Sequence, residues 1–160
     1  FPMDNHAGGI SMIAFVVALG VSMGYYQFVY VPQANAKPVF PKEVLEPPDV
    51  TKVTISEGSS LEANPKFYVP KEVRATLGRS NLVIWTNQDT VPHTVTTDTD
   101  YKDLYSGVFD SQARPSEEGG AFVMPGLTYE FLFTKAGEYA YHCVPHPWMQ
   151  GSVEVVENFS

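Results

Sequence analysis

The sequence predicts an all-β sandwich or barrel that is preceded by a single transmembrane α-helix. Three observations support this fold class. Residues 8–32 contain no charged side chain, several later runs alternate apolar and polar residues, and 13 prolines and 12 glycines interrupt the chain. Alternation with a period of two is typical of half-buried strands, and Gly and Pro favour the turns that join short strands.

The composition limits the classes of function open to this chain. Of its 160 residues 44% are hydrophobic, which is enough to bury the core of one ordinary domain. The formal net charge of −8 argues against a nucleic acid as partner, because phosphates repel an acidic surface. Cys143 is the only cysteine, so an intrachain disulfide and a zinc site with two thiolates are excluded. A nucleophile, a metal thiolate and an inert core residue remain as alternatives for its role.

We expect four segments, in this order: an N-terminal flank at 1–7, the transmembrane helix at 8–32, a Pro-rich linker at 33–50 and a β domain at 51–160. The 22 residues from Ile10 to Val31 would form a helix roughly 33 Å long, which spans the apolar core of a bilayer. A secretory signal peptide is the alternative, because Ala34-Asn35-Ala36 resembles a cleavage site. The apolar run is longer than the roughly 7–15 residues usual in signal peptides, so we favour an uncleaved anchor.

Two features of the helix bear on its partners and its orientation. Gly20 and Gly24 form a GxxxG pair, whose small side chains would let another transmembrane subunit pack closely against the helix. Lys37 and Lys42 follow the helix, and the positive-inside rule taken alone would place that side in the cytoplasm. The rule is weak for a large translocated domain, so these lysines do not decide the orientation.

Short β-prone runs recur between turn residues after the linker. The expected strands cover 53–55, 81–86, 94–97, 128–133, 138–143 and 152–156. In the run that begins at Thr128, for example, Tyr129, Phe131 and Phe133 fall on one face. Short alternating strands of this kind predict an antiparallel sandwich or barrel.

The sequence YHCVPHPWMQG brings three candidate metal ligands into one short loop. Cys143, His146 and Met149 follow the spacing C-x2-H-x2-M, at the end of an alternating strand and before a glycine that we expect in a turn. A thiolate, an imidazole and a thioether suit copper, which accepts soft sulfur ligands. Pro145 and Pro147 flank His146 and restrict the backbone of the loop.

A trigonal copper site with two histidines, one cysteine and a weak axial methionine needs a second imidazole. His93 is the best candidate, because it lies just past the turn-like Asn87-Gln88-Asp89 that ends the strand of Trp85. His142 directly precedes Cys143 in a strand, so its side chain should point to the opposite face. We therefore expect His142 outside the site.

Other interpretations of these residues stay open at this point. Taken singly, Cys143 could be an inert core residue, Met149 a core filler and His93 a satisfied polar residue. A nucleophilic pair of Cys143 and His146 is a further alternative, although it gives Met149 no role and the loop offers no orienting carboxylate. A binuclear copper centre would need two bridging cysteines, which the sequence lacks.

The segments LVIWTNQDTVPHTV and GEYAYHCVPHPWMQGSVEV resemble the first-histidine region and the ligand loop of type 1 (blue) copper proteins of the plastocyanin/amicyanin (cupredoxin) family. The resemblance covers residues 51–156, and the short C-x2-H-x2-M loop is most similar to the amicyanin type. It implies a Greek-key β-sandwich with one type 1 copper ion, held by His93, Cys143, His146 and Met149. Family members often carry Asn after the first histidine. Here the hydroxyl of Thr94 would have to link the two ligand loops instead.

The resemblance also implies a function. We expect a membrane-anchored carrier, not an enzyme, that transfers single electrons between membrane redox proteins, either as a mobile protein or as a non-catalytic subunit of a larger membrane oxidoreductase complex. Family members resemble carriers of periplasmic or external spaces, so we expect a single-pass protein of the cell membrane with its soluble domain on the extracytoplasmic face. A copper-storage or copper-delivery protein is the alternative.

Two surface features would serve such a carrier. Apolar residues around His146 would form a docking surface for a transient partner. Asp98, Asp100 and Asp103 lie close together in the sequence and could steer a basic partner toward the domain.

Overall fold

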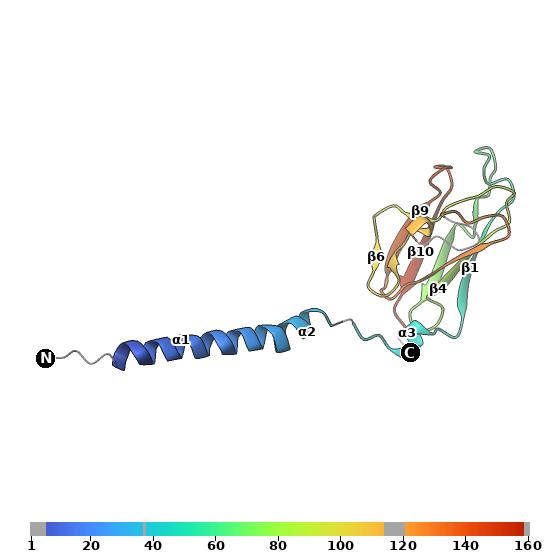
Figure 1. The fold of residues 1–160 in the computed structure, drawn as a ribbon. Coiled ribbons are helices and arrows are strands. Elements are labelled where there is room, and N and C mark those ends of the chain that lie inside the picture. The colour runs from blue at the N-terminus through green and yellow to red at the C-terminus, as the bar shows by residue number, and fades with distance from the viewer. Residues whose placement is uncertain (1–5, 37, 114–120, 159–160) are drawn as a thin grey trace. The chain divides into compact units, whose positions relative to one another are not determined.

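The structure is a computed structural model that describes residues 6–36, 38–113 and 121–158 (Figure 1). The chain divides into two compact units, Phe1–Pro38 and Val39–Ser160, and each is described by itself. The first unit contains the long N-terminal helix, and the second contains all of the described strands.

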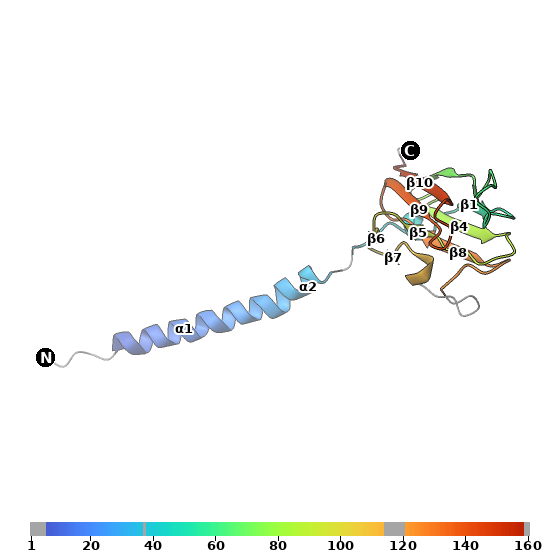
Figure 2. The ribbon, with the colours of Figure 1, turned by 90° about the horizontal axis from the view of Figure 1, so that it is seen from above.

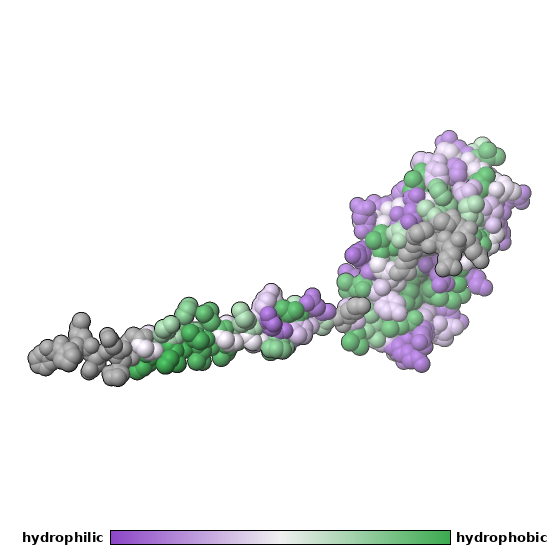
Figure 3. All heavy atoms as spheres, viewed as in Figure 1, coloured by the Kyte–Doolittle hydropathy of each residue, from purple (hydrophilic) through white to green (hydrophobic). Residues whose placement is uncertain are grey.

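The first unit is an apolar helix with one widened turn. Its elements are α1 (His6–Tyr25), a π-helical turn (Tyr26–Tyr30) and α2 (Val31–Ala34). Pro32 has no amide proton, and the amide of Val31 directly before it bonds to the carbonyl of Tyr26, five residues back. Gly9–Ala34 is long and apolar enough to cross a membrane, and Figure 3 shows apolar side chains along α1. This helix is a candidate membrane span or signal sequence.

The second unit is a sandwich of two four-stranded sheets (Figure 2). The first sheet has the order β2-β1-β4-β8, formed by β2 (Tyr68–Val69), β1 (Val50–Ile55), β4 (Leu82–Asn87) and β8 (Thr128–Leu132). The second has the order β3-β10-β9-β5, formed by β3 (Glu72–Thr76), β10 (Gln150–Val156), β9 (Gly137–His142) and β5 (Thr96–Thr97). Outside the sheets lie a two-stranded ladder of β6 (Lys102–Asp103) and β7 (Gly107–Val108) and a 3-10 turn (Ser111–Ala113).

Both sheets are mixed, whereas the sequence predicted antiparallel pairing. β1 runs parallel to β4, with Val50 opposite Leu82 and Ile55 opposite Asn87. β3 runs parallel to β10, and the other strand pairs of the two sheets are antiparallel. Alternation identifies a strand but not the direction of its partner, which is why the prediction was wrong for these two pairs. Consecutive strands such as β4 and β5 lie in different sheets, so the chain crosses between the two layers of the sandwich.

Inward-facing residues of both sheets form the core. Trp85 on β4 is fully buried, and its ring lies 5.5 Å from that of Tyr141 on β9 in an edge-to-face arrangement. Gly151, which we expected in a turn, lies inside β10 opposite Tyr141. A Cβ atom on Gly151 would lie 2.6 Å from the Tyr141 hydroxyl, so this position requires glycine because the aromatic ring covers it.

The end of the sandwich opposite the ligand loop is covered by residues 39–49, part of the segment that we expected as a linker at 33–50. In this stretch α3 spans Lys42–Leu45, and Val44 packs against the core. The carbonyl of Val44 accepts a 2.8 Å hydrogen bond from the side-chain amide of Asn81, just before β4. Asn87 at the far end of β4 precedes the loops that carry the candidate site. β4 therefore connects the α3 end of the sandwich to the site.

Candidate metal centre

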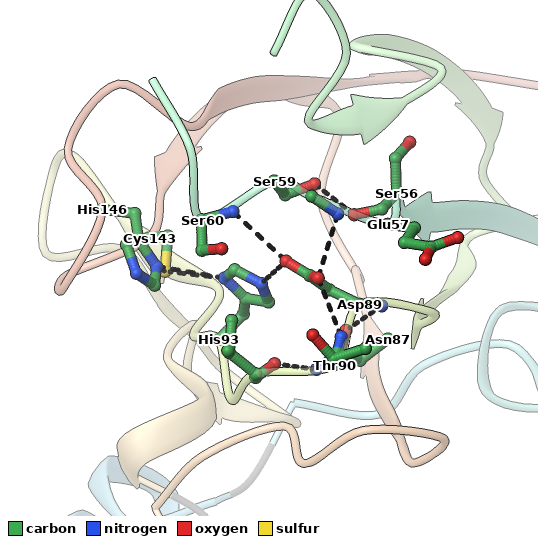
Figure 4. A network of polar contacts seen from close by, with 12 residues as sticks. Ser56, Glu57, Ser59, Ser60, Asn87, Asp89, Thr90, His93, Cys143 and His146 are labelled. Atoms are coloured by element: carbon green, nitrogen blue, oxygen red, sulfur yellow. Dashed lines mark hydrogen bonds and ion pairs between the residues drawn. The ribbon is translucent and has the colours of Figure 1, made fainter. Parts of the chain in front are cut away.

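Three predicted ligands meet at one end of the sandwich. The Sγ atom of Cys143 lies 3.6 Å from Nδ1 of His93 and 3.5 Å from Nδ1 of His146 (Figure 4). The two Nδ1 atoms are 3.2 Å apart. A metal ion in a trigonal plane, with metal–ligand distances of about 2.0–2.3 Å, separates its ligand atoms by about 3.6 Å. The spacing of the three side chains therefore fits one metal ion.

His93 is positioned by the turn that follows β4. The side chain of Asn87 donates to the carbonyls of Val91 and Val123, both at 2.8 Å, and fixes the start of the turn. The amide of His93 donates to the carbonyl of Val123 at 3.2 Å, and a return bond of 2.8 Å completes an isolated bridge. The imidazole is fully buried, with Nδ1 toward Cys143 and Nε2 toward Asp89. Burial lowers the pKa of His93, while the carboxylate of Asp89 opposes this effect.

The second ligand segment is a tight loop between β9 and β10. The amide of Cys143 donates to the carbonyl of Met149 at 3.1 Å, and the amide of Met149 donates to the carbonyl of His146 at 2.9 Å. These backbone hydrogen bonds hold Cys143, His146 and Met149 close together in one tight loop. Cys143 and Met149 are fully buried, while His146 is half-buried. The loop thus places sulfur inside the domain and one imidazole at its surface.

The thiol of Cys143 is protected from water. Burial raises its pKa, and the amide of Thr94, which donates to Sγ at 3.3 Å, opposes this effect. A buried thiol of this kind becomes a thiolate when a metal cation supplies the compensating charge. This environment suits a metal ligand better than a nucleophile, which needs a lowered pKa and access to substrate.

Thr94 and His142 lie where the sequence predicted them. The hydroxyl of Thr94 accepts a 2.8 Å hydrogen bond from the amide of Val144, so it links the two ligand segments. His142 points away from the site and is half-exposed, with its Nδ1 in contact with a carboxylate oxygen of Asp98. Asp103, by contrast, is buried and holds a loop, so it is not one of the surface carboxylates that we expected to steer a partner.

Trp148 connects the ligand loop to another loop of the domain. Its ring lies 5.4 Å from that of His146, and its Nε1 donates to the carbonyl of Ser59 at 3.2 Å. The tryptophan also packs against the core while remaining partly exposed. Next to it, Val144 has 46% of its surface exposed, and Pro145 and Pro147 are exposed as well.

Asp89 is a site residue that the sequence analysis did not assign. Its carboxylate Oδ2 lies 2.8 Å from Nε2 of His93, and both side chains are buried. Burial alone would raise the pKa of Asp89, but hydrogen bonds from His93 and from the amides of Gly58, Thr90 and Ser60 lower it to about 2. The signal in the sequence is an acidic residue four positions before the histidine, in the turn that also carries the family resemblance.

Comparison with known proteins identifies the family. The sequence model of the copper-binding proteins of the plastocyanin/azurin family matches residues 52–156. The chain belongs to this family. Among curated relatives, amicyanin of Paracoccus denitrificans is 33% identical over 93 residues, which are 58% of this chain and 60% of that protein. Amicyanin-alpha of Methylorubrum extorquens is 34% identical over 93 residues, which are 58% of this chain and 66% of that protein.

The solved structures agree with this assignment. A purple cupredoxin from Nitrosopumilus maritimus matches with a TM-score of 0.50 and 26% identity, over 66% of this chain and 99% of that one. The chain thus spans about 60–66% of the length of the two amicyanins and nearly all of the purple cupredoxin. Copper is the cofactor of this domain, and the His93, Cys143 and His146 groups are placed to bind one ion.

Proposed function

We propose that this chain is a membrane-anchored type 1 copper protein that carries single electrons between redox partners. The observation that carries the proposal is the close triangle of two imidazole nitrogens and one buried thiol. We assign His93, Cys143 and His146 as copper ligands, and Met149, buried in the same loop, as the weak axial ligand. Copper in this donor set supplies a reversible one-electron couple.

The residues around the site favour electron transfer over catalysis. All four assigned ligands come from the chain itself, so no coordination position is left for a substrate. The loop bonds between Cys143, His146 and Met149 hold the donors in one arrangement, which keeps structural rearrangement between the oxidation states small. His146 is the one half-exposed member of the triangle, so its ring edge is the shortest route for an electron to the surface.

The surface around His146 supports docking of a transient partner. Val144, Pro145 and Pro147 are exposed beside it, and Trp148 adds part of its ring. An apolar area at the point where electrons leave the domain allows a partner to approach closely without dehydrating charged groups. We therefore propose that donor and acceptor bind in turn at this apolar end.

We further propose that α1 is an uncleaved anchor and that the copper domain works on the extracytoplasmic side of the cell membrane. The length and composition of Gly9–Ala34 support the anchor. Its partners are then membrane redox proteins. Gly20 and Gly24 leave open space on the helix, where another transmembrane subunit can pack if the protein is a non-catalytic part of an oxidoreductase complex.

The visible spectrum of the copper-loaded full chain in detergent tests the proposed site. We expect an intense thiolate-to-copper band in the oxidised protein, which disappears on reduction and returns on reoxidation. Cys143→Ser should remove the band while circular dichroism still shows a folded β domain. His142→Ala is the matched control, because His142 is the strand neighbour of Cys143 but points away from the site.

The same cycles of reduction and reoxidation distinguish an electron carrier from a copper-storage or copper-delivery protein. A carrier keeps its copper through repeated oxidation and reduction, whereas a delivery protein releases it in one of the two states. A colourless copper-loaded wild type, or a Cys143→Ser variant that keeps the band, would contradict the ligand assignment. Loss of copper in each cycle would favour the storage or delivery alternative.

A further inference from the structure

Asp89 is a buried carboxylate at the centre of a polar network beside the candidate ligand His93 (Figure 4). Its Oδ1 accepts hydrogen bonds from the amides of Gly58 at 3.0 Å and Thr90 at 2.8 Å. Its Oδ2 accepts from the amide of Ser60 at 3.2 Å and lies 2.8 Å from Nε2 of His93. Three of these four partners are backbone amides, which can only donate, so the carboxylate form satisfies the network.

The position of Asp89 determines which nitrogen of His93 carries the proton. Nδ1 faces Cys143 and His146, and Nε2 faces the carboxylate. A carboxylate oxygen can only accept, so the Nε2 atom must be the donor and Nδ1 keeps its lone pair. An imidazole that ligates a metal through one nitrogen is typically oriented by a hydrogen bond from the other.

We propose that Asp89 is the positioning residue of the copper site: it holds His93 in the tautomer and orientation that bind copper through Nδ1, and its negative charge stabilises Cu(II) relative to Cu(I). This inference rests on the proposed function. The charge matters because the site is buried, where electrostatic interactions are weakly screened. Cu(II) carries one more positive charge than Cu(I), so it is attracted more strongly to the carboxylate.

Asp89 also connects the two sides of the site through the loop that follows β1. The amides of Gly58 and Ser60 bond to Asp89, and the carbonyl of the intervening Ser59 accepts from Trp148 on the ligand loop. Gly58 has φ +77°, and a Cβ atom there would lie 2.9 Å from the side-chain amide of Asn64, so the loop shape depends on glycine. Through this loop, Asp89 links His93 to the segment that carries the other assigned ligands.

The test compares two buried aspartates. Asp89→Asn removes the charge and puts an NH2 group in place of one carboxylate oxygen, where two donors require an acceptor. Asp103→Asn is the matched control, because Asp103 is also buried and accepts hydrogen bonds from the amides of Tyr105, Ser106 and Thr134. Asp103 does not contact the ligands. The reduction potential of the copper-loaded full chain is measured for the wild type and both variants.

We expect Asp89→Asn to shift the Cu(II)/Cu(I) equilibrium at least tenfold toward Cu(I), which raises a one-electron potential by about 59 mV. Asp103→Asn should lower the stability of the domain. Its Cu(II)/Cu(I) equilibrium should stay within twofold of that of the wild type. A blue wild type whose potential is unchanged by Asp89→Asn contradicts this role of Asp89 alone. A colourless copper-loaded wild type contradicts the proposed function, and the role of Asp89 with it.

If Asp89→Asn does not fold, a second measurement on the wild type tests which nitrogen of His93 carries the proton. In the Cu(I) protein, which is diamagnetic, nitrogen-15 NMR should show His93 with a proton on Nε2 that exchanges slowly with solvent. The side chain of His142, half-exposed and outside the site, provides the fast-exchanging comparison. An unprotonated Nε2 on His93, or a proton there that exchanges as fast as that of His142, overturns the inference.

Discussion

The hydroxyl oxygen of Thr94 lies 2.8 Å from the amide nitrogen of Val144 and accepts a hydrogen bond from it. Thr94 directly follows the assigned ligand His93, and Val144 directly follows Cys143. A single short side chain thus joins the two segments that form the site. The amide of Thr94 also donates to Sγ of Cys143. Thr94 therefore contacts the thiol through its backbone and the next residue, Val144, through its side chain.

Thr94→Val should weaken this connection while it keeps the size and branching of the side chain. The variant loses the acceptor for the Val144 amide but retains the backbone bond to Cys143. We expect the free energy of unfolding of the apoprotein to fall by about 1 kcal/mol, and the thiolate-to-copper band to shift. Denaturant titration and the visible spectrum measure the two effects.

Thr51→Val is the control for Thr94→Val. The Thr51 hydroxyl donates to the carbonyl of Ser80 at 2.9 Å, at the α3 end of the sandwich. Its loss should reduce stability by a similar amount and leave the spectrum unchanged. If the two variants have identical spectra, the hydroxyl of Thr94 does not influence the copper site.

Met149→Leu should retain copper and raise the reduction potential. Leu keeps the apolar volume of this fully buried residue but removes the thioether, and the axial ligand is one of the groups that tune the potential of such sites. We expect a rise on the order of 60 mV, which is a tenfold change in a one-electron equilibrium. Protein-film voltammetry measures it, with Met124→Leu, the other methionine of 39–160, as control. Loss of copper, or an unchanged potential, would remove Met149 from the ligand set.

Asp103→Asn should destabilise the domain in a pH-dependent way. Burial alone would raise the pKa of Asp103, but hydrogen bonds from Ser106, Thr134 and Tyr105 lower it below its usual value. The folded state therefore binds the proton less readily than the unfolded chain, whose pKa is about 3.9. The carboxylate stabilises the fold above that pH, and its contribution is lost as the pH falls toward the folded pKa.

Unfolding of wild type and Asp103→Asn at several pH values checks this expectation. At pH 7 the variant should be less stable by about 1–3 kcal/mol, and the difference should shrink below about pH 4. Asp100→Asn is the exposed control, with an expected effect within about 0.5 kcal/mol. A constant difference between wild type and Asp103→Asn from pH 7 to pH 3 would contradict the proposed contribution of the charge.

Limited proteolysis should locate the tether between the helix and the sandwich. Because Val44 in the middle of 39–49 is held by Asn81 and by core packing, we expect cleavage within 35–38 rather than throughout 33–50. The released fragment should begin near Val39 and retain its copper. Mass spectrometry of the fragment gives the cut site, and Val44→Asp, which disrupts the packing of this segment, should extend cleavage into 40–49.

The same digestion tests the orientation. In intact spheroplasts the tether should be cut, since we propose that the domain lies on the extracytoplasmic face. Protection until the membrane is broken, while control proteins of the outer face are digested, would reverse the proposed orientation.

The local features of the fold could be predicted from the sequence, and its pairings could not. β4, β8 and β9 have clear alternation and turn residues at their ends, and the structure places them within a residue or two of the expected strands. β3 was missed because Glu72-Val73-Arg74-Ala75-Thr76 offers only two buried side chains, one of them alanine. Its stability comes from pairing with β10, about eighty residues later, and no local pattern records that partner.

The same limit applies to the candidate site. Cys143, His146 and Met149 could be predicted because the three donor types lie in one short motif. Asp89 and Asp103 could not be distinguished from surface acids such as Asp98. In the fold, loops that are distant in sequence surround Asp89 and Asp103 and donate hydrogen bonds to them, for example from the amides of Gly58 and Thr134. These donors become neighbours of the two carboxylates only in the folded chain.

The place of β10 in the second sheet determines when the site can form during synthesis. β10 lies between β3 and β9, so among the described strands β3 has no partner in its sheet until β10 has been made. Fifty residues separate His93 from Cys143, so the first imidazole leaves the ribosome long before the thiol that faces it. Pairings of such long range make folding slow and leave strand edges exposed to aggregation meanwhile. A nascent chain can therefore assemble the complete set of assigned copper ligands only after the β9–β10 hairpin has emerged and docked beside β3.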